Sequence, residues 1–431
     1  MKMTRRSFMS HATAVAAIPA VFGQAKRTYR FAVVGCGGRG NGAVKNFIEA
    51  VELLGGEAKL VAAADFFVER AQKTMRENGG DEKFAFGTAS GYRKVLETDA
   101  EFILLCTPPF FRARHAEAAF AAGKHVFAEK PIATDPRTLR HFLSVAETAK
   151  QKGLMLLAGT QKRHNPAYQA LMDSIAAGSL GKIVGAQVIR FNGTPPIRKR
   201  LPGDTNAAYL CRSWYSFWEM SGDFYTEQVI HDVDIMNWAL GRYPKSAMGT
   251  GGRWTRPKGV GNIYDSFSME YDYGDNFFAQ TTARQMPGVA NRTGVRVTGT
   301  EAQVFLPGMI KRHDGTRINL EAAEKKYWSR VSRVVTPQTL EHFDALKALQ
   351  EGRVVNDGEQ VALSTASCML GTLAAYSGGV VRMSDILTDA KSPFFDGWNA
   401  RFRPEDFESG SDVQLPPEGE SRAPEVQSPY I

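Results

Sequence analysis

A glycine-rich turn near the N-terminus constrains the fold of this chain more than any other feature. The motif Gly-Cys-Gly-Gly-Arg-Gly (residues 35–40) follows an apolar, strand-like run directly and opens a helix-like stretch. In such a unit Gly35 permits the tight turn, Gly37 lets the backbone approach a pyrophosphate, and Gly40 allows the helix to pack closely on the strand. The phosphates would then lie at the helix N-terminus, where free N–H groups favour negative charge. The residues expected around them are Gly35, Gly37, Gly38, Arg39 and Gly40.

The second strand-like run favours one nucleotide over another. It ends on Asp65, 25 residues after Gly40, near the spacing of the acid that accepts hydrogen bonds from the adenosine ribose. A carboxylate there repels a 2′-phosphate, and the adjoining Phe66 and Phe67 supply no cation in its place. The sequence therefore predicts NAD as the cofactor and disfavours NADP.

Alternating apolar runs and helix-like stretches predict a doubly wound α/β domain over residues 28–155. Short apolar strands separated by helices of ten or more residues are typical of a parallel sheet covered on both faces. The strand-like runs are residues 30–35, 58–65, 102–107 and 125–127, and the helix-like stretches are residues 41–54, 68–78, 115–122 and 136–152.

The pattern changes in the second part of the chain. Alternating, β-branched and aromatic runs cover residues 183–191, 247–253, 264–273, 277–284 and 293–299. They predict an α+β domain over residues 156–385 with a large, open, mostly antiparallel sheet, and Tyr273-Gly274-Asp275-Asn276 as a hairpin turn. Helical stretches at 342–350 and 359–377 follow and could return to the first domain. Residues 386–431 are rich in Pro, Ser and acids and predict an arm or tail.

The N-terminus predicts export. Arg5 and Arg6 precede a modestly apolar stretch (residues 12–22) and small residues at 23–25, a pattern typical of a twin-arginine signal peptide over residues 1–25. We therefore expect a periplasmic or otherwise exported protein. The apolar stretch is shorter than the roughly 20 residues that span a bilayer as a helix, so no membrane span is expected.

Charge and cysteine content exclude other classes of protein. The net charge of +8 is a mild excess scattered among acids over 431 residues, which argues against nucleic-acid binding. Four widely spaced cysteines form no Cys-x-x-Cys pair, so neither a metal site nor a disulfide framework is expected.

Two further strand ends hold candidate functional residues. Thr107 and Pro108 end one strand, and Glu129-Lys130-Pro131 ends the next. A lysine at the carboxyl end of a parallel strand lies at the crevice where ligands bind.

With these motifs the chain resembles the Gfo/Idh/MocA family of NAD(P)-dependent sugar and polyol oxidoreductases over residues 28–385. The family carries the glycine turn, a Thr-Pro strand end and Glu-Lys-Pro in this order. The resemblance implies that Thr107, Pro108 and Glu129 border the cofactor. It also implies that Lys130 lies beside the nicotinamide and the substrate hydroxyl.

The resemblance also implies an acid four residues before a histidine and an aspartate three residues after it. Glu227, His231 and Asp234 match this pattern, although family members more usually have Asp at the first position. On a helix Glu227 and His231 would share a face. His231 would act as the general base and Lys130 would stabilise the developing alkoxide.

Polar and aromatic residues elsewhere in the chain are candidates for lining a sugar-binding site. The alternative is that they only pack at the interface between the two domains. The expected substrate-binding residues are Gln161, Arg163, Arg212, Trp214 and Asp234.

Three functions stay open. The first is hydride transfer between a sugar or polyol carbinol and NAD. The second is an exported glycoside hydrolase that holds NAD tightly and oxidises the sugar transiently, with Tyr225 or Glu227 as a second base. The third is a non-catalytic sugar sensor, which loss of Lys130 or His231 would have favoured. The family resemblance further implies a homodimer or homotetramer formed through the open face of the second sheet.

Overall fold

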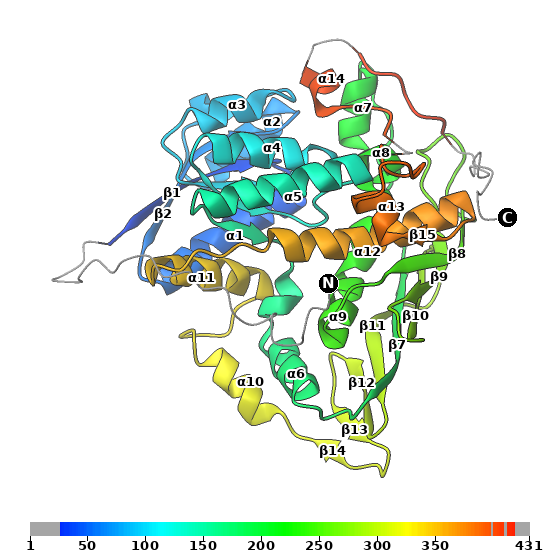
Figure 1. Cartoon of the computed structure of the whole chain (residues 1–431). Coiled ribbons are helices and arrows are strands. Elements are labelled where there is room, and N and C mark those ends of the chain that lie inside the picture. Colours follow the sequence, from blue (N-terminus) through cyan, green and yellow to red (C-terminus); the bar gives the residue numbers. More distant parts are fainter. Residues whose placement is uncertain (1–25, 398–399, 409–411, 419–431) are drawn as a thin grey trace.

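The computed structural model describes residues 26–397, 400–408 and 412–418. Two sheets organise it, and helices lie between and around them (Figure 1). The signal peptide predicted for residues 1–25 lies outside the described residues. Within the described ranges no helix is both long and apolar enough to cross a membrane, and all four cysteines are free.

The first sheet has six parallel strands in the order β3-β2-β1-β4-β5-β6. Its central strand β4 is entirely buried, because helices cover both faces of the sheet. The predicted doubly wound fold is confirmed. The strands are β1 (Thr28–Val34), β2 (Glu57–Ala64), β3 (Ala85–Phe86), β4 (Phe102–Leu105), β5 (His125–Ala128) and β6 (Leu156–Ala158).

Helices of this first part fill the crossovers between its strands. They are α1 (Gly38–Leu53), α2 (Val68–Glu77), the 3-10 turn η1 (Glu82–Phe84), α3 (Gly91–Leu96), α4 (Pro109–Ala121) and α5 (Pro136–Gln151). Asp135 caps α5 by accepting a hydrogen bond from the Thr138 backbone N–H at 2.9 Å, and Pro136 occupies the first helical position.

The second sheet has nine strands in the order β14-β13-β12-β11-β7-β10-β9-β8-β15. Strands β7 and β10 pair in parallel, and the other neighbours are antiparallel, which agrees with the predicted mostly antiparallel sheet. The strands are β7 (Ile183–Asn192), β8 (Ser246–Gly252), β9 (Ser266–Asp272), β10 (Phe278–Gln285), β11 (Arg292–Gly299), β12 (Ala302–Leu306), β13 (Ile310–Arg312), β14 (Arg317–Ile318) and β15 (Val381–Arg382).

The predicted hairpin turn joins β9 to β10. Gly274, Asp275 and Asn276 all have positive φ angles of 81°, 57° and 56°, which suits Gly, Asp and Asn better than other residues. The turn is closed by a hydrogen bond from the Phe277 N–H to the Gly274 carbonyl.

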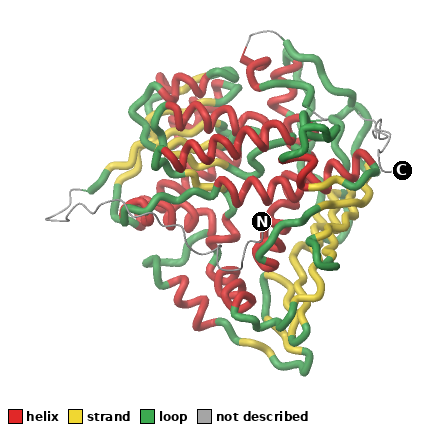
Figure 2. Tube along the Cα trace, in the orientation of Figure 1, coloured by secondary structure: helices red, strands yellow, loops and turns green. Residues whose placement is uncertain are grey.

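Among the residues that the structure describes, helices cover one face of the second sheet and leave the other open. Strands β9 and β10 alternate between buried and exposed residues, and the helices lie on the side that faces the first sheet (Figure 2). The helices and turns of this part are η2 (Gln161–His164), α6 (Pro166–Ala176), α7 (Asn206–Arg212), η3 (Trp214–Ser216), α8 (Trp218–Ser221), the π-helix η4 (Tyr225–Val229), α9 (Ile230–Leu240) and α10 (Glu321–Trp328).

The later helices join the two sheets. Helix α11 (Pro337–Gln350) packs on α1 and adds Phe343 and Leu346 to the apolar cluster around the first sheet. Helix α12 (Gly358–Ser377) packs both on α5 and on β8. The two sheets are therefore held by a shared helical layer, which fixes the crevice between them.

The described part of the C-terminal segment docks on the first sheet's helices. It contains α13 (Met383–Leu387) and α14 (Pro404–Glu408), and Figure 1 shows α14 beside α7. Phe402 and Phe407 pack against Phe110, and Phe407 also contacts Phe111. A 2.6 Å ion pair joins Glu408 to Arg93. We call residues 400–408 and 412–418 the C-terminal arm.

Candidate active site

The glycine turn between β1 and α1 has the shape that a dinucleotide needs. Gly35 has a φ angle of +96°, and a β-carbon there would lie 2.5 Å from the carbonyl carbon of Cys106. A β-carbon at Gly40 would collide with the carbonyl of Gly35. At Gly37 and Gly38, in contrast, a β-carbon would meet nothing within 4 Å. The turn is therefore tight toward the protein and open outward, as close approach of a pyrophosphate requires.

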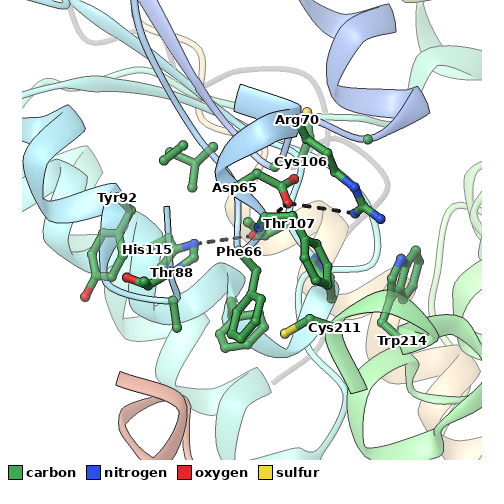
Figure 3. Close-up of a pocket in the computed structure, with 18 residues that line it drawn as sticks. Asp65, Phe66, Arg70, Thr88, Tyr92, Cys106, Thr107, His115, Cys211 and Trp214 are labelled. Carbon is green, nitrogen blue, oxygen red and sulfur yellow. Dashed lines mark hydrogen bonds and ion pairs between the residues drawn. The ribbon is translucent and has the colours of Figure 1, made fainter. Parts of the chain in front are cut away.

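A pocket opens beside this turn, at the carboxyl ends of β1, β2 and β4 (Figure 3). Helix α4 adds Phe111 and His115, and the segment from α7 to η3 adds Cys211 and Trp214 from the second part of the chain. Among its lining residues are Gly35, Gly37, Asp65, Phe66, Phe67, Arg70, Thr107 and Pro108. Five of the ten residues predicted to bind the cofactor thus line one cavity.

Asp65 lines this pocket and joins the glycine turn to the start of α2 by hydrogen bonds. Its carboxylate accepts hydrogen bonds from the backbone N–H of Cys36 at 2.8 Å and of Phe67 at 3.0 Å. Burial raises the pKa of Asp65 above its ordinary value, and the two backbone hydrogen bonds oppose that rise. Each carboxylate oxygen has a second lone pair, so both can still accept a ligand hydroxyl.

Arg70 is a cation that the sequence interpretation missed. Phe66 and Phe67 themselves supply none, but Arg70 lies in the first turn of α2 and its Nη1 is 3.8 Å from the Asp65 carboxylate. Its guanidinium also lies over the Phe67 ring, and it lines the pocket. The start of a helix directly after Phe67 would have indicated this, because residues three apart on a helix are neighbours.

Thr107 and Trp214 line the same pocket, and Arg212 lies against the Phe67 ring beside it. The hydroxyl of Thr107 is 3.4 Å from Nδ1 of His115. Arg212 makes a two-fold contact with Asp204 at 2.8 and 2.9 Å, and its guanidinium lies 4.3 Å from the centre of the Phe67 ring. Arg212 and Trp214 therefore lie on the nucleotide side of the crevice.

Glu129 connects the strand end of β5 to the glycine turn. One carboxylate oxygen is 2.9 Å from Nε of Arg39, and the other accepts a hydrogen bond from the backbone N–H of Lys130. Glu341 of α11 is buried nearby. Burial, and then the negative charge of Glu129, raise the pKa of Glu341 well above its ordinary value. Both effects favour the neutral form of Glu341, which reduces repulsion between two buried carboxylates.

Lys130 and Glu227 form a buried ion pair across the crevice. The ammonium of Lys130 lies 2.9 Å from a carboxylate oxygen of Glu227 and donates to its backbone carbonyl at 2.6 Å. Both side chains are only 8% exposed. The pair brings the end of β5 to the helical segment that carries His231.

The helical segment differs from the regular α-helix that we predicted. Residues Tyr225–Val229 form a π-helix, and α9 begins only at Ile230. The wider turn changes the angle between Glu227 and His231 from that of two residues on one α-helical face. Spacing in the sequence does not reveal a π-helix, since the number of residues between the two side chains is the same.

His231 lines a small pocket together with Lys130, Thr160 and Lys162. Burial, and then the positive charges of Lys130, Arg190 and Lys162, lower the pKa of His231 well below its ordinary value. The imidazole is therefore neutral at pH 7 and can accept a proton.

Lys162 and Arg190 share one buried acid, which the sequence interpretation did not include. Asp232 is fully buried and lies 2.5 Å from the ammonium of Lys162 and 2.7 Å from Nη1 of Arg190. Asp232 follows His231 directly and is held between η2 and β7. The sequence shows an acid directly after the histidine, but it does not show that this acid is buried or which two distant cations contact it.

Arg163 and Asp234 face each other. Arg163 donates two hydrogen bonds of 2.8 Å to the Asp234 carboxylate, which also accepts from Gln360 at 2.5 Å and from Ser364 at 2.6 Å. Four donors on one carboxylate make a clamp between η2, α9 and α12. Gln161, the first residue of η2, lies two residues before Arg163.

Comparisons with known proteins agree with this geometry. Residues 29–160 match the oxidoreductase family with an NAD-binding Rossmann fold (GFO_IDH_MocA), and residues 168–305 match the GFO/IDH/MocA C-terminal domain. Inositol 2-dehydrogenase of Rhizobium meliloti is 28% identical over 246 residues, which are 56% of this chain and 64% of that enzyme. The match therefore spans slightly less than two thirds of that relative.

Two further proteins are similar. The scyllo-inositol 2-dehydrogenase (NAD(+)) of Bacillus subtilis is 26% identical over 288 residues, which are 66% of this chain and 75% of that enzyme. The crystal structure of the WlbA dehydrogenase from Bordetella pertussis, in complex with NADH and UDP-GlcNAcA, superposes with a TM-score of 0.65. That comparison covers 83% of this chain and 98% of the other at 20% identity, which shows a shared fold.

Proposed function

Because this chain belongs to the Gfo/Idh/MocA family of NAD-binding oxidoreductases, we propose that it transfers a hydride between a sugar or polyol carbinol and nicotinamide. The observation that carries the proposal is the common location of Lys130 and His231. Both line one small pocket at the strand end next to the nucleotide pocket. The two relatives named as inositol dehydrogenases support a polyol or sugar as the substrate.

The Rossmann domain binds NAD. The open side of the glycine turn fits the pyrophosphate, and Asp65 offers carboxylate oxygens to the adenosine ribose. Thr107 and Pro108 border the side of the pocket toward the strand ends. Bound NAD supplies the hydride acceptor when a carbinol is oxidised.

His231 takes the carbinol proton in this proposal. Its lowered pKa keeps it neutral, so it can accept that proton at pH 7 without first losing one of its own. Lys130 holds the substrate oxygen and stabilises the negative charge that develops on it. Glu227 orients Lys130 through their 2.9 Å contact.

The glycoside-hydrolase alternative has less support. The named relatives are dehydrogenases, and Tyr225, one of the two candidate second bases, is fully buried with its hydroxyl 2.9 Å from that of Tyr271. Burial raises the pKa of Tyr225 far above its ordinary value. The other candidate, Glu227, is already paired with the ammonium of Lys130.

Association into a homodimer or homotetramer stays a prediction. On the uncovered face of the second sheet, Met248 and Phe278 are about half exposed, with values of 52% and 51%. Exposed apolar residues on one sheet face suit contact with a second copy.

The test separates positioning from proton transfer. His231→Ala should retain NAD and lower turnover by about 10²–10⁴, the usual contribution of a positioned acid–base group. Lys130→Met should also retain NAD and lose activity, because the charge that stabilises the alkoxide is gone. The double variant should be little worse than the worse single variant, since both residues act on one oxygen.

The measurement is single-turnover hydride transfer, followed by nicotinamide absorbance, with myo-inositol and glucose as first substrates. His141→Ala, a substitution of a half-exposed histidine on α5, is the matched control and should keep wild-type rates. Wild-type rates in His231→Ala would remove His231 from the mechanism.

A further inference from the structure

Arg256 is a buried cation outside the site described so far. It lies in the loop between β8 and β9, and only 6% of the residue is exposed. All three guanidinium nitrogens are buried and have no hydrogen-bond partner among the described residues. Three other cations of the crevice differ, because Lys130, Arg163 and Arg190 each contact a carboxylate.

The carboxylates near Arg256 are already used by other donors. Asp265 accepts from the backbone N–H groups of Trp254, Thr255 and Arg256 itself, so it fixes the loop and leaves the guanidinium apart. Asp223 accepts from the Tyr376 hydroxyl at 2.7 Å and from the Tyr264 N–H at 2.9 Å. Arg253, the neighbouring cation, donates to backbone carbonyls of the same loop.

Arg256 cannot lose its buried charge by giving up a proton. Its guanidinium stays charged at all relevant pH values and presents five N–H donors in a fixed plane. A buried charge without a partner is costly, and groups of this kind are normally paired. The planar fork matches a carboxylate or a phosphate, which it can bind with two parallel hydrogen bonds.

Gln285 lies beside the loop that carries Arg256. Gln285, at the end of β10, donates to the Tyr215 hydroxyl at 2.7 Å, and its own amide oxygen is buried without a partner. The backbone N–H of Gln285 donates to the carbonyl of Asp265, which also holds the Arg256 loop.

The charges of both Glu227 and Arg256 act on the Tyr215 hydroxyl. Burial raises the pKa of Tyr215 well above its ordinary value, the charge of Glu227 adds to the rise, and the charge of Arg256 opposes it. The register of β7 and β10 independently places Gln285 on the same sheet face as Arg190, and Arg190 contacts Asp232 and Gln228 beside His231.

From this arrangement we propose that the substrate carries an anionic group, and that Arg256 binds it with Gln285 beside it. The proposal rests on the proposed hydride transfer and specifies its substrate class: a sugar acid or a sugar phosphate whose carbinol lies at Lys130 and His231. The carboxylate or phosphate completes the hydrogen bonding of the guanidinium, and a sugar hydroxyl can donate to the free amide oxygen of Gln285.

The experiment uses pairs of sugars that differ in charge. Glucose and myo-inositol are the neutral ligands, and glucuronate, gluconate and glucose 6-phosphate are the anionic ones, so that carboxylate and phosphate are distinguished. Binding to the NAD-loaded protein is measured by calorimetric titration, and oxidation by nicotinamide absorbance. The variants are Arg256→Gln, Arg256→Lys and Lys258→Gln, the last a control that removes one exposed cation two residues away.

We expect the wild type to bind at least one anionic sugar about 10- to 100-fold more tightly than its neutral counterpart, in line with a charge-assisted hydrogen-bond pair. Arg256→Gln should abolish this preference, Arg256→Lys should restore part of it, and Lys258→Gln should leave it intact. The melting temperature of Arg256→Gln without ligand should equal or exceed that of the wild type, because an unpaired buried charge is removed.

Failure of this proposal and failure of the proposed function give different results. Oxidation of neutral sugars with no preference for anionic ones would overturn the role of Arg256 and leave hydride transfer standing. Anionic sugars that bind in an Arg256-dependent way without reducing NAD would support the anion site and count against the oxidation. Equal binding of chloride, inorganic phosphate and anionic sugars would overturn the proposal, since no sugar would then be recognised.

Discussion

Replacing Asp65 with Asn should weaken NAD binding and strengthen NADP binding at the same time. In the wild type the carboxylate faces the nucleotide pocket, and Arg70 lies 3.8 Å from it. If Asp65 accepts hydrogen bonds from the adenosine ribose, losing its charge should weaken NAD binding about 10- to 100-fold. Asn has nearly the same size and keeps one oxygen for the backbone N–H of Cys36 or Phe67, so the turn should fold.

The gain for NADP follows from the charges. Two unit charges about 5 Å apart, at an effective dielectric constant of about 20, repel by about 3 kcal/mol, which corresponds to about 100-fold in affinity. Asp65→Asn removes this repulsion of a 2′-phosphate and leaves the cation of Arg70 without a neighbouring acid. The ratio of NADP to NAD affinity should therefore rise by at least about 100-fold.

The assay is calorimetric titration of nucleotide-free protein with NAD and with NADP. Arg70→Met serves as the matched comparison, because it should leave NAD binding nearly unchanged and should remove part of the NADP gain when combined with Asp65→Asn. An unchanged ratio of the two affinities in Asp65→Asn, in protein with a normal melting temperature, would refute the placement of the ribose at Asp65.

Three further predictions concern pH and export. The acid limb of kcat/KM for oxidation should lie below about pH 6.5, because the pKa of His231 is lowered and the base fails only when it is protonated; a limb above that value would contradict its role. Burial, and then the charge of Arg39, lower the pKa of His342 to about 3, so the stability due to its neutral form is lost as pH falls below about 6.5. His342→Phe should consequently lose about 2 kcal/mol less unfolding free energy between pH 7 and pH 5 than the wild type, as denaturant titrations would reveal. Changing Arg5 and Arg6 to Lys should leave folded precursor in the cytoplasm, whereas a normal periplasmic yield would exclude a twin-arginine signal.

The features that the sequence predicted well depend on local patterns. The buried β4 is a continuous apolar run, and Gly35 and Gly40 are needed for a turn that leaves no room for a β-carbon at either position. The hairpin at Gly274 likewise follows from residues that tolerate positive φ angles. In contrast, β3 and β6 have only two and three residues, too few to show a period.

Contacts between distant residues account for most of what the sequence could not show. Asp232 meets Lys162 and Arg190 only because η2, α9 and β7 converge in the fold. A charged residue is ordinarily read as part of a solvated surface, and the sequence offers no sign that Arg256 is buried. The π-helix at Glu227 is equally hidden, since it changes the geometry and not the number of residues.

The C-terminal arm packs against a wall of the nucleotide pocket and is synthesised after the rest of that pocket. Phe67 and Cys211 line the nucleotide pocket, and they belong to the same apolar cluster as Phe402 and Phe407 of the arm. The ribosome makes the glycine turn before the arm, so the outer support of the pocket wall is added only after the arm has been made. A product that ends before residue 400 would contain every residue proposed to bind NAD and still lack this support. The wall of the cofactor site thus depends on residues that are made long after the glycine turn.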